Sequence, residues 1–149
     1  MANQITLVRR ETKSMAKKIS ATQRNPVPAS PDLPGPVSRK NAEHYRWGVD
    51  CDAWYLVNDE QLSVIEEFMP PGAAEIRHHH QKAQQFFYIL SGEAIMEVEG
   101  NPVLVPAGSG IRIMPGVRHQ IRNPSSSPLR LLVISHPPSH GDKFEAPVS

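Results

Sequence analysis

The amino-acid sequence predicts an all-β domain, an antiparallel sandwich or barrel, preceded by a separate N-terminal segment. From about residue 43, alternating apolar and polar residues form short runs, and Gly, Pro, Asn or Ser closes each run. No stretch between residues 43 and 136 has the apolar spacing of a long helix. Fifteen prolines and nine glycines, with only 6% aromatic residues, favour many short segments joined by turns.

The expected strands follow one another at short intervals along the chain. Residues 46–57 are expected to form one or two strands before the first turn. Further strands are expected over residues 62–68, 75–80, 85–90, 93–99, 102–105, 110–114, 118–122 and 129–136. Strands of this length and spacing are typical of an antiparallel sandwich or barrel.

The beginning of the chain differs in composition from the rest. Residues 1–40 carry eight Lys and Arg against two acidic residues, whereas residues 41–149 carry eight against thirteen. Five prolines in residues 25–37 fix φ and remove backbone donors, so this stretch is expected to be an extended linker. We therefore expect a basic, Pro-rich, flexible arm over residues 1–37. The barrel is expected over residues 38–149, with its core in residues 43–136 and a short C-terminal tail.

Composition also excludes several classes of protein. The sequence has no run of 18 apolar residues and no secretory signal after its start, so we expect neither membrane insertion nor export. Cys51 is the single cysteine, which excludes an internal disulfide and fits a reducing, cytoplasmic compartment. The body lacks a basic face, so we expect no nucleic-acid partner.

The chemistry is expected at the histidines, three of which are consecutive at positions 78–80. Alternation along the expected strand 75–80 sorts its side chains. The expected inward residues are Ala74, Ile76, His78 and His80, and the expected outward residues are Glu75, Arg77 and His79. Two imidazoles at i and i+2 on one strand face can bind the same metal ion. Gln85 begins the next strand, and His119 follows the tight Pro115-Gly116 turn.

The remaining inward-facing residues are expected to be apolar. Phe87 and Ile89 share the face of Gln85 and should form a pocket wall, and no general acid or base is evident. Trp47 and Trp54 could line the mouth of the barrel, or pack in the core or a subunit interface. His140 is expected to be solvated in the polar tail.

Two stretches resemble the conserved motifs of the cupin family. The first, Gly72-x5-His78-x-His80-x4-Gln85-x6-Gly92, is similar to the first cupin motif, whose usual form has Glu at the position of Gln85. The second, Gly108-x5-Met114-Pro115-Gly116-x2-His119-x3-Asn123, is similar to the second motif, whose usual form has Pro at the position of Met114. Fifteen residues separate the two, and the resemblance covers roughly residues 60–136.

The resemblance implies a double-stranded β-helix, or jelly-roll, barrel with a metal site. His78, His80, Gln85 and His119 would converge on a divalent transition metal, which could be Fe, Mn, Ni, Zn, Co or Cu. Since Gln85 is neutral, the ion would keep its full charge and be a stronger Lewis acid, at some cost in affinity. The competing interpretation is a polar pocket that holds sugar or water and no metal.

Fold and metal together do not name a reaction. The first hypothesis is a small enzyme with isomerase- or lyase-type chemistry on an oxygen-rich molecule such as a sugar or sugar acid. The alternatives are a three-histidine Fe(II) dioxygenase and a non-catalytic small-ligand-binding or sensor cupin. The expected partners are a small-molecule ligand and a second copy of the chain, because a homodimer would cover exposed sheet edges.

Overall fold

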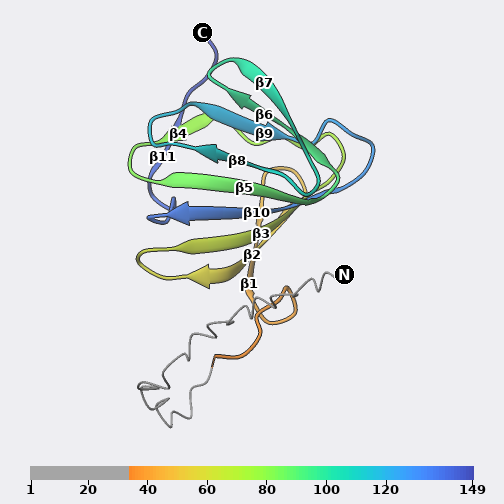
Figure 1. Cartoon of the computed structure of the whole chain (residues 1–149), viewed down its shortest axis with the longest axis vertical. Helices are drawn as coiled ribbons and strands as arrows, with labels where there is room; N and C mark the ends of the chain where they lie inside the picture. Colours follow the sequence, from red (N-terminus) through yellow and green to blue (C-terminus); the bar gives the residue numbers. More distant parts are fainter. Residues whose placement is uncertain (1–33) are drawn as a thin grey trace, which may run out of the picture. The chain divides into compact units, whose positions relative to one another are not determined.

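The computed structural model describes residues 34–149, and its regular structure is entirely β. Almost all of the arm expected over residues 1–37 lies outside the described residues. Within 34–149, eleven strands form two antiparallel sheets (Figure 1). In that same range, no helix is long and apolar enough to span a membrane. The expected fold class, an all-β jelly-roll barrel, is confirmed.

The larger sheet has six strands in the order β1-β2-β3-β10-β5-β8. Its strands are β1 (Glu43–Trp47), β2 (Cys51–Asn58), β3 (Ser63–Met69), β10 (Leu129–His136), β5 (Gln84–Ser91) and β8 (Gly110–Ile113). The late strand β10 lies between β3 and β5, so the chain returns to the middle of this sheet after building most of the other one.

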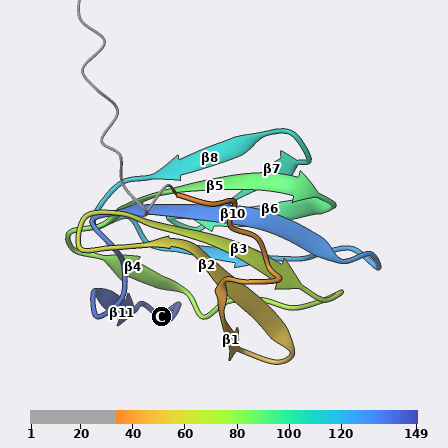
Figure 2. The ribbon, with the colours of Figure 1, turned by 90° about the horizontal axis from the view of Figure 1, so that it is seen from below.

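The smaller sheet has five strands in the order β11-β4-β9-β6-β7. Its strands are β11 (Lys143–Glu145), β4 (His78–His80), β9 (His119–Arg122), β6 (Glu93–Val98) and β7 (Asn101–Pro106). Figure 2 shows β11 beside β4, with which it pairs over all three residues of each strand. The C-terminal segment therefore belongs to the barrel as an edge strand, which the sequence analysis did not predict.

The interior changes from apolar to polar along the strands. On β10 the inward residues run from Leu129 through Leu131 and Val133 to Ser135, all of them buried. At the polar end, Ser135 is opposite Ser63 of β3 and Gln85 of β5, which are buried as well. The apolar end provides hydrophobic stabilisation, while the polar end is where the buried histidines lie.

The strand expected over residues 75–80 is wrong in its first half. Only His78–His80 is a strand, and Ile76, expected inside, is 60% exposed. Upstream of His78 the chain still pairs with β9, because the Glu75 N–H donates to Ile121 O and Ala74 is opposite Arg122, but the register is shifted by one residue from the His78–His119 pair. One extra residue in a strand interrupts the alternation of side chains. Glu75 and His78, three residues apart, therefore both line the interior cavity.

Candidate metal centre

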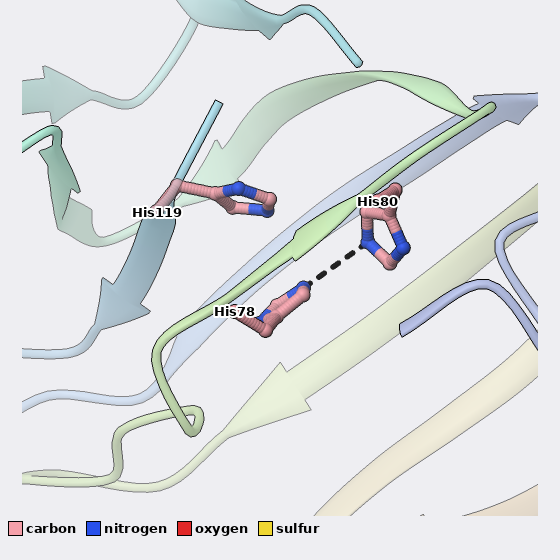
Figure 3. Close-up of side chains that lie close together, drawn as sticks. All are labelled: His78, His80 and His119. Carbon is pink, nitrogen blue, oxygen red and sulfur yellow. Dashed lines mark hydrogen bonds between the residues drawn. The ribbon is translucent and has the colours of Figure 1, made fainter. Parts of the chain in front are cut away.

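Three imidazoles meet inside the barrel. His78, His80 and His119 are all buried, and one ring nitrogen of each lies within 4.8 Å of the other two. His78 and His80 come from the same face of β4, and His119 comes from β9 (Figure 3). His79 points away from this cluster and stacks on Phe144 of β11, with 5.5 Å between ring centroids. The predicted register of β4 at its three histidines is confirmed.

Backbone carbonyl groups set the tautomer of each ring. Nδ1 of His78 contacts Ile76 O at 2.7 Å, Nδ1 of His80 contacts Asp142 O at 2.8 Å, and Nδ1 of His119 contacts Val117 O at 2.9 Å. A carbonyl oxygen only accepts hydrogen bonds, so each Nδ1 must carry the hydrogen. In the neutral rings, every Nε2 then has a free lone pair.

These lone pairs face one another. The Nε2 atoms of His78 and His80 are 3.1 Å apart (Figure 3). Burial lowers the pKa of His78 to about 4, although the Glu75 carboxylate acts in the opposite direction, and burial also lowers the pKa of His119. At neutral pH the His78 and His119 rings are therefore uncharged. Neutral imidazoles with converging Nε2 lone pairs match the needs of a divalent transition metal.

Gln85 presents an oxygen atom to the same cluster. Its Nε2 amide group donates to Ser135 Oγ at 3.1 Å, which turns its Oε1 atom towards His119 Nε2 at 3.2 Å. Both of these facing atoms are acceptors, so they too are suited to contact a cation rather than each other. The side chains expected at the metal site thus lie together, and a fourth neutral donor completes the set.

Short local structures hold the second part of the cluster in register. His119 is directly opposite His78 in the β4–β9 pair. Before β9, Gly116 adopts φ 81°, a left-handed conformation that glycine reaches without strain. The Gly116 N–H donates to His80 O at 2.6 Å. The Pro115-Gly116 turn is therefore attached to the strand that carries the other two histidines.

A cavity of about 240 Å³ opens onto this cluster. His78, His80 and Gln85 line it on one side, and Phe87 provides the expected apolar wall, whereas Ile89 is buried deeper in the core. Trp47 lines the cavity, in agreement with the prediction that it could lie at the mouth of the barrel. Trp54 lies elsewhere. The Arg39 guanidinium group is 5.4 Å from the centroid of its ring, and the His44 ring lies tilted against it, with 5.1 Å between ring centroids.

Two carboxyl groups that the sequence analysis missed also line the cavity. Glu75 lies there because the pairing with β9 shifts by one residue before β4. Its Oε1 is 3.9 Å from His78 Nε2 and 2.9 Å from Lys143 Nζ. Glu67 lies there because it shares the inward face of β3 with Ser63, Ile65 and Met69. Strict alternation along β3 would have found Glu67, but only the register shift against β9 reveals Glu75. The expectation that the remaining inward-facing residues are apolar is therefore wrong.

The C-terminal segment forms the rim of the cavity. His140, expected to be solvated in a tail, lines it together with neighbouring residues 138–141 and with Lys143. The carboxylate of Asp142 accepts hydrogen bonds from the backbone N–H groups of residues 81, 82 and 83, at 2.9–3.0 Å. A distant part of the chain thus fixes the turn that joins β4 to β5.

The other polar residues near the motifs have structural roles. Asn123 is buried, and its Nδ2 donates to Met69 O, Pro70 O and Ser127 O, so it fixes the backbone after β9. The arginines around His119 are exposed; Arg118 pairs with Glu99 at 2.6 Å and Arg112 donates to Gln84.

Comparison with known proteins finds related chains. A family model described as "Cupin domain" matches residues 65–135. An uncharacterized protein of Methanocaldococcus jannaschii is 35% identical over 81 residues, which is 54% of this chain and 65% of that protein. The chain spans between 20% and 65% of the length of the curated relatives it matches.

Solved structures share the fold at lower identity. An RmlC-like cupin from Shewanella frigidimarina is 21% identical, covers 70% of this chain and 92% of its own, and has a TM-score of 0.64. A sugar phosphate isomerase of the cupin superfamily from Silicibacter pomeroyi is 18% identical, covers 67% and 74%, and has a TM-score of 0.60. The two sheets, the motifs and the family match agree that residues 65–135 of this chain form a cupin domain.

Proposed function

We propose that this cupin is a metal-dependent enzyme with isomerase- or lyase-type chemistry on a small, oxygen-rich molecule such as a sugar or sugar acid. The position of Glu75 carries the proposal. Its Oε1 atom lies 3.9 Å from His78 Nε2, beside the point that the imidazoles face. Isomerisation and β-elimination both begin with removal of a proton from a carbon next to a carbonyl or carboxyl group, so both need a base at such a place.

The residues of the site would divide the work. A divalent ion held by His78, His80, His119 and Gln85 would polarise ligand oxygens and stabilise the negative charge that develops on them. Glu75 accepts the proton as the C–H bond breaks, and the bonding electrons move towards the ligand oxygen. Lys143, 2.9 Å from the same carboxylate, keeps it oriented. In isomerisation Glu75 then returns the proton to the former carbonyl carbon, while the hydroxyl proton of the first carbon passes to the former carbonyl oxygen. In elimination Glu75 gives the proton to the departing oxygen.

Cavity size supports a small ligand. A volume of about 240 Å³ corresponds to roughly eight water molecules, which is below the usual range for drug-sized pockets. A hydroxy or keto acid of about three to six carbons fits this space. The sugar phosphate isomerase that shares the fold makes sugar derivatives the first class of molecule to test.

Proton exchange tests the proposal without knowledge of the product. The protein, purified without an affinity tag, is analysed for bound metal and then loaded with each candidate ion. It is incubated in D₂O with sugar acids, sugar phosphates and diketones, and proton NMR follows the loss of C–H signals. We expect metal-dependent exchange for at least one compound, abolished in E75Q although that variant still binds metal.

Other outcomes of the same experiment would favour the alternatives. Oxygen consumption that occurs only with Fe(II) would indicate a three-histidine dioxygenase. Saturable binding of a compound without exchange or turnover would indicate a ligand-binding or sensor protein. Absence of metal binding would contradict the proposal outright.

A further inference from the structure

The carboxyl group of Glu67 is in an unusual position for an acidic side chain. It projects from the inward face of β3, and its register partners on the two neighbouring strands are Ala53 of β2 and Leu131 of β10. Both partners are fully buried and apolar. A residue with a purely structural role between them would be apolar, because burial of a carboxyl group among such neighbours costs free energy.

Glu67 also lacks the partners that such a group usually has. Among residues 34–149, no cation lies within ion-pair distance of its carboxyl group, and no hydrogen bond to it is formed. The adjacent Glu66, on the outer face of β3, shows the contrast: it pairs with Arg130 at 2.6 Å and with Arg39 at 3.3 Å. The unmet hydrogen-bonding capacity of Glu67 is directed at the cavity that it lines.

Glu67 and two histidines of the cluster, His78 and His80, line the same cavity. Glu67 belongs to the six-stranded sheet, and the three histidines belong to the five-stranded sheet. A ligand that occupies the cavity between them can contact both. Burial, with a smaller contribution from the charge of Glu75, raises the pKa of Glu67 to about 8, against the effect of Lys143. In the metal-free protein at neutral pH the carboxyl group therefore keeps its proton and can donate it in a hydrogen bond.

We propose that Glu67 is a ligand-binding residue, which donates a hydrogen bond to an oxygen atom of a small hydroxy or keto acid held at its other end by the metal centre. This inference rests on the proposed function and specifies its substrate class. The neutral donors His78, His80, His119 and Gln85 leave the ion its full positive charge, while the charges of Lys143 and Glu75 offset each other. A ligand whose anionic end binds the ion, and whose other end carries a hydrogen-bond acceptor near Glu67, would complement both sides of the cavity.

Three variants separate this role from a structural one. E67Q keeps a neutral hydrogen-bond donor of the same shape, E67L replaces it with an apolar side chain suited to Ala53 and Leu131, and E66Q is the matched control on the outer face. E67A serves in place of E67L should the leucine variant fail to fold. Binding of the metal alone is measured first, by titration with Co(II) and Zn(II). We expect the same affinity, within about threefold, for the wild type and all variants.

Calorimetry then measures binding of glycerate, tartrate, D-gluconate and D-glucuronate to the metal-loaded proteins. We expect at least one acid to bind the wild type, E67Q and E66Q alike, and to bind E67L about 10- to 100-fold more weakly. Equal binding by E67L, equal weakening in E67Q and E67L, or no binding of any acid by a wild type that does bind metal would each overturn the inference. Failure of the wild type to bind metal would instead remove the proposed function on which it rests.

Discussion

The backbone carbonyl oxygen of Asp142 lies 2.8 Å from Nδ1 of His80 and accepts its hydrogen, although 62 positions separate the two residues. This single contact selects the tautomer that leaves the Nε2 lone pair of His80 free for a metal ion. The Asp142 carboxylate also holds the turn over residues 81–83. Asp142, near the end of the chain, therefore positions the expected metal-binding residue His80 and the turn that follows it.

Replacement of Asp142 tests this positioning role. In D142A three backbone N–H groups lose their acceptor, and the segment that presents the Asp142 carbonyl group loses its attachment to the turn. We expect metal affinity to fall about 10- to 100-fold, as is usual when groups that orient a ligand are lost. Isothermal titration with Zn(II) or Co(II) measures the change.

Asp59 offers a matched control. Its carboxylate accepts hydrogen bonds from the backbone N–H groups of Gln61 and Leu62, at 2.7 and 2.8 Å, in the turn between β2 and β3. D59A and D142A should both lower the melting temperature. D59A, however, should leave metal affinity within about threefold of the wild type. Equal metal affinity in D142A and D59A would show that His80 does not depend on Asp142.

Charge at the fourth donor should set the affinity for the ion. In Q85E an anionic oxygen replaces a neutral one on a side chain of the same length, so binding of a divalent ion should tighten by about tenfold or more. H119A should weaken binding by a larger factor, because a whole imidazole is lost. Competition titrations with a metal indicator measure both. Equal or weaker binding by Q85E would mean that Gln85 contacts the substrate and not the ion.

The carboxyl group of Glu67 should make the stability of the metal-free protein depend on pH. Burial raises the pKa of Glu67 to about 8 in the folded protein, against about 4.5 in the unfolded chain, so between these values the unfolded chain releases a proton that the folded chain keeps. The free energy of unfolding should therefore fall as pH rises from about 4.5 to 8, by about 1.4 kcal/mol for each unit of raised pKa. Below this window the carboxyl group is protonated in both the folded and the unfolded chain, so it contributes no pH dependence to the free energy of unfolding.

Urea denaturation of the wild type and E67Q, both in the presence of a chelator, measures this effect. E67Q should lose this pH dependence, so the difference between the two proteins should grow up to about pH 8 and then level off. A constant difference would mean that Glu67 ionises normally. Subtraction of the variant is required because other titratable groups face Glu67 or its neighbours, namely Tyr45, Cys51, Tyr55, Glu75 and Lys143.

A chain that begins at Ser38 should keep the barrel and its metal centre. Within the described part of the chain, residues 34–149, those that line the cavity or hold the histidines begin at residue 45, so the melting temperature should fall only slightly. Size-exclusion chromatography of the shortened and complete chains, side by side, also tests the expected homodimer. Unfolding or loss of metal on shortening would place the domain boundary before residue 38.

Much of the site could be predicted from the sequence because it depends on local geometry. Side chains two apart on a strand share a face, which places His78 and His80 together, and a Pro-Gly turn positions His119 at the start of the next strand. The resemblance to the two cupin motifs implies, in addition, that the segments that carry His78 and His119 lie side by side. The outward direction of His79 follows from the same alternation.

The tertiary structure alone decided which other residues surround that centre. Alternation fails over residues 75–77, where the pairing with β9 shifts by one residue and leaves Glu75 inside and Ile76 outside. The contact between Asp142 and His80 and the ion pair between Lys143 and Glu75 join segments more than 60 positions apart. No local pattern encodes such contacts, since they form only when β11 pairs with β4 at the sheet edge. Local patterns in the sequence were enough to predict the barrel and to bring His78, His80, Gln85 and His119 together. The packing of distant segments was needed to place Glu75, Lys143 and the C-terminal rim at the cavity.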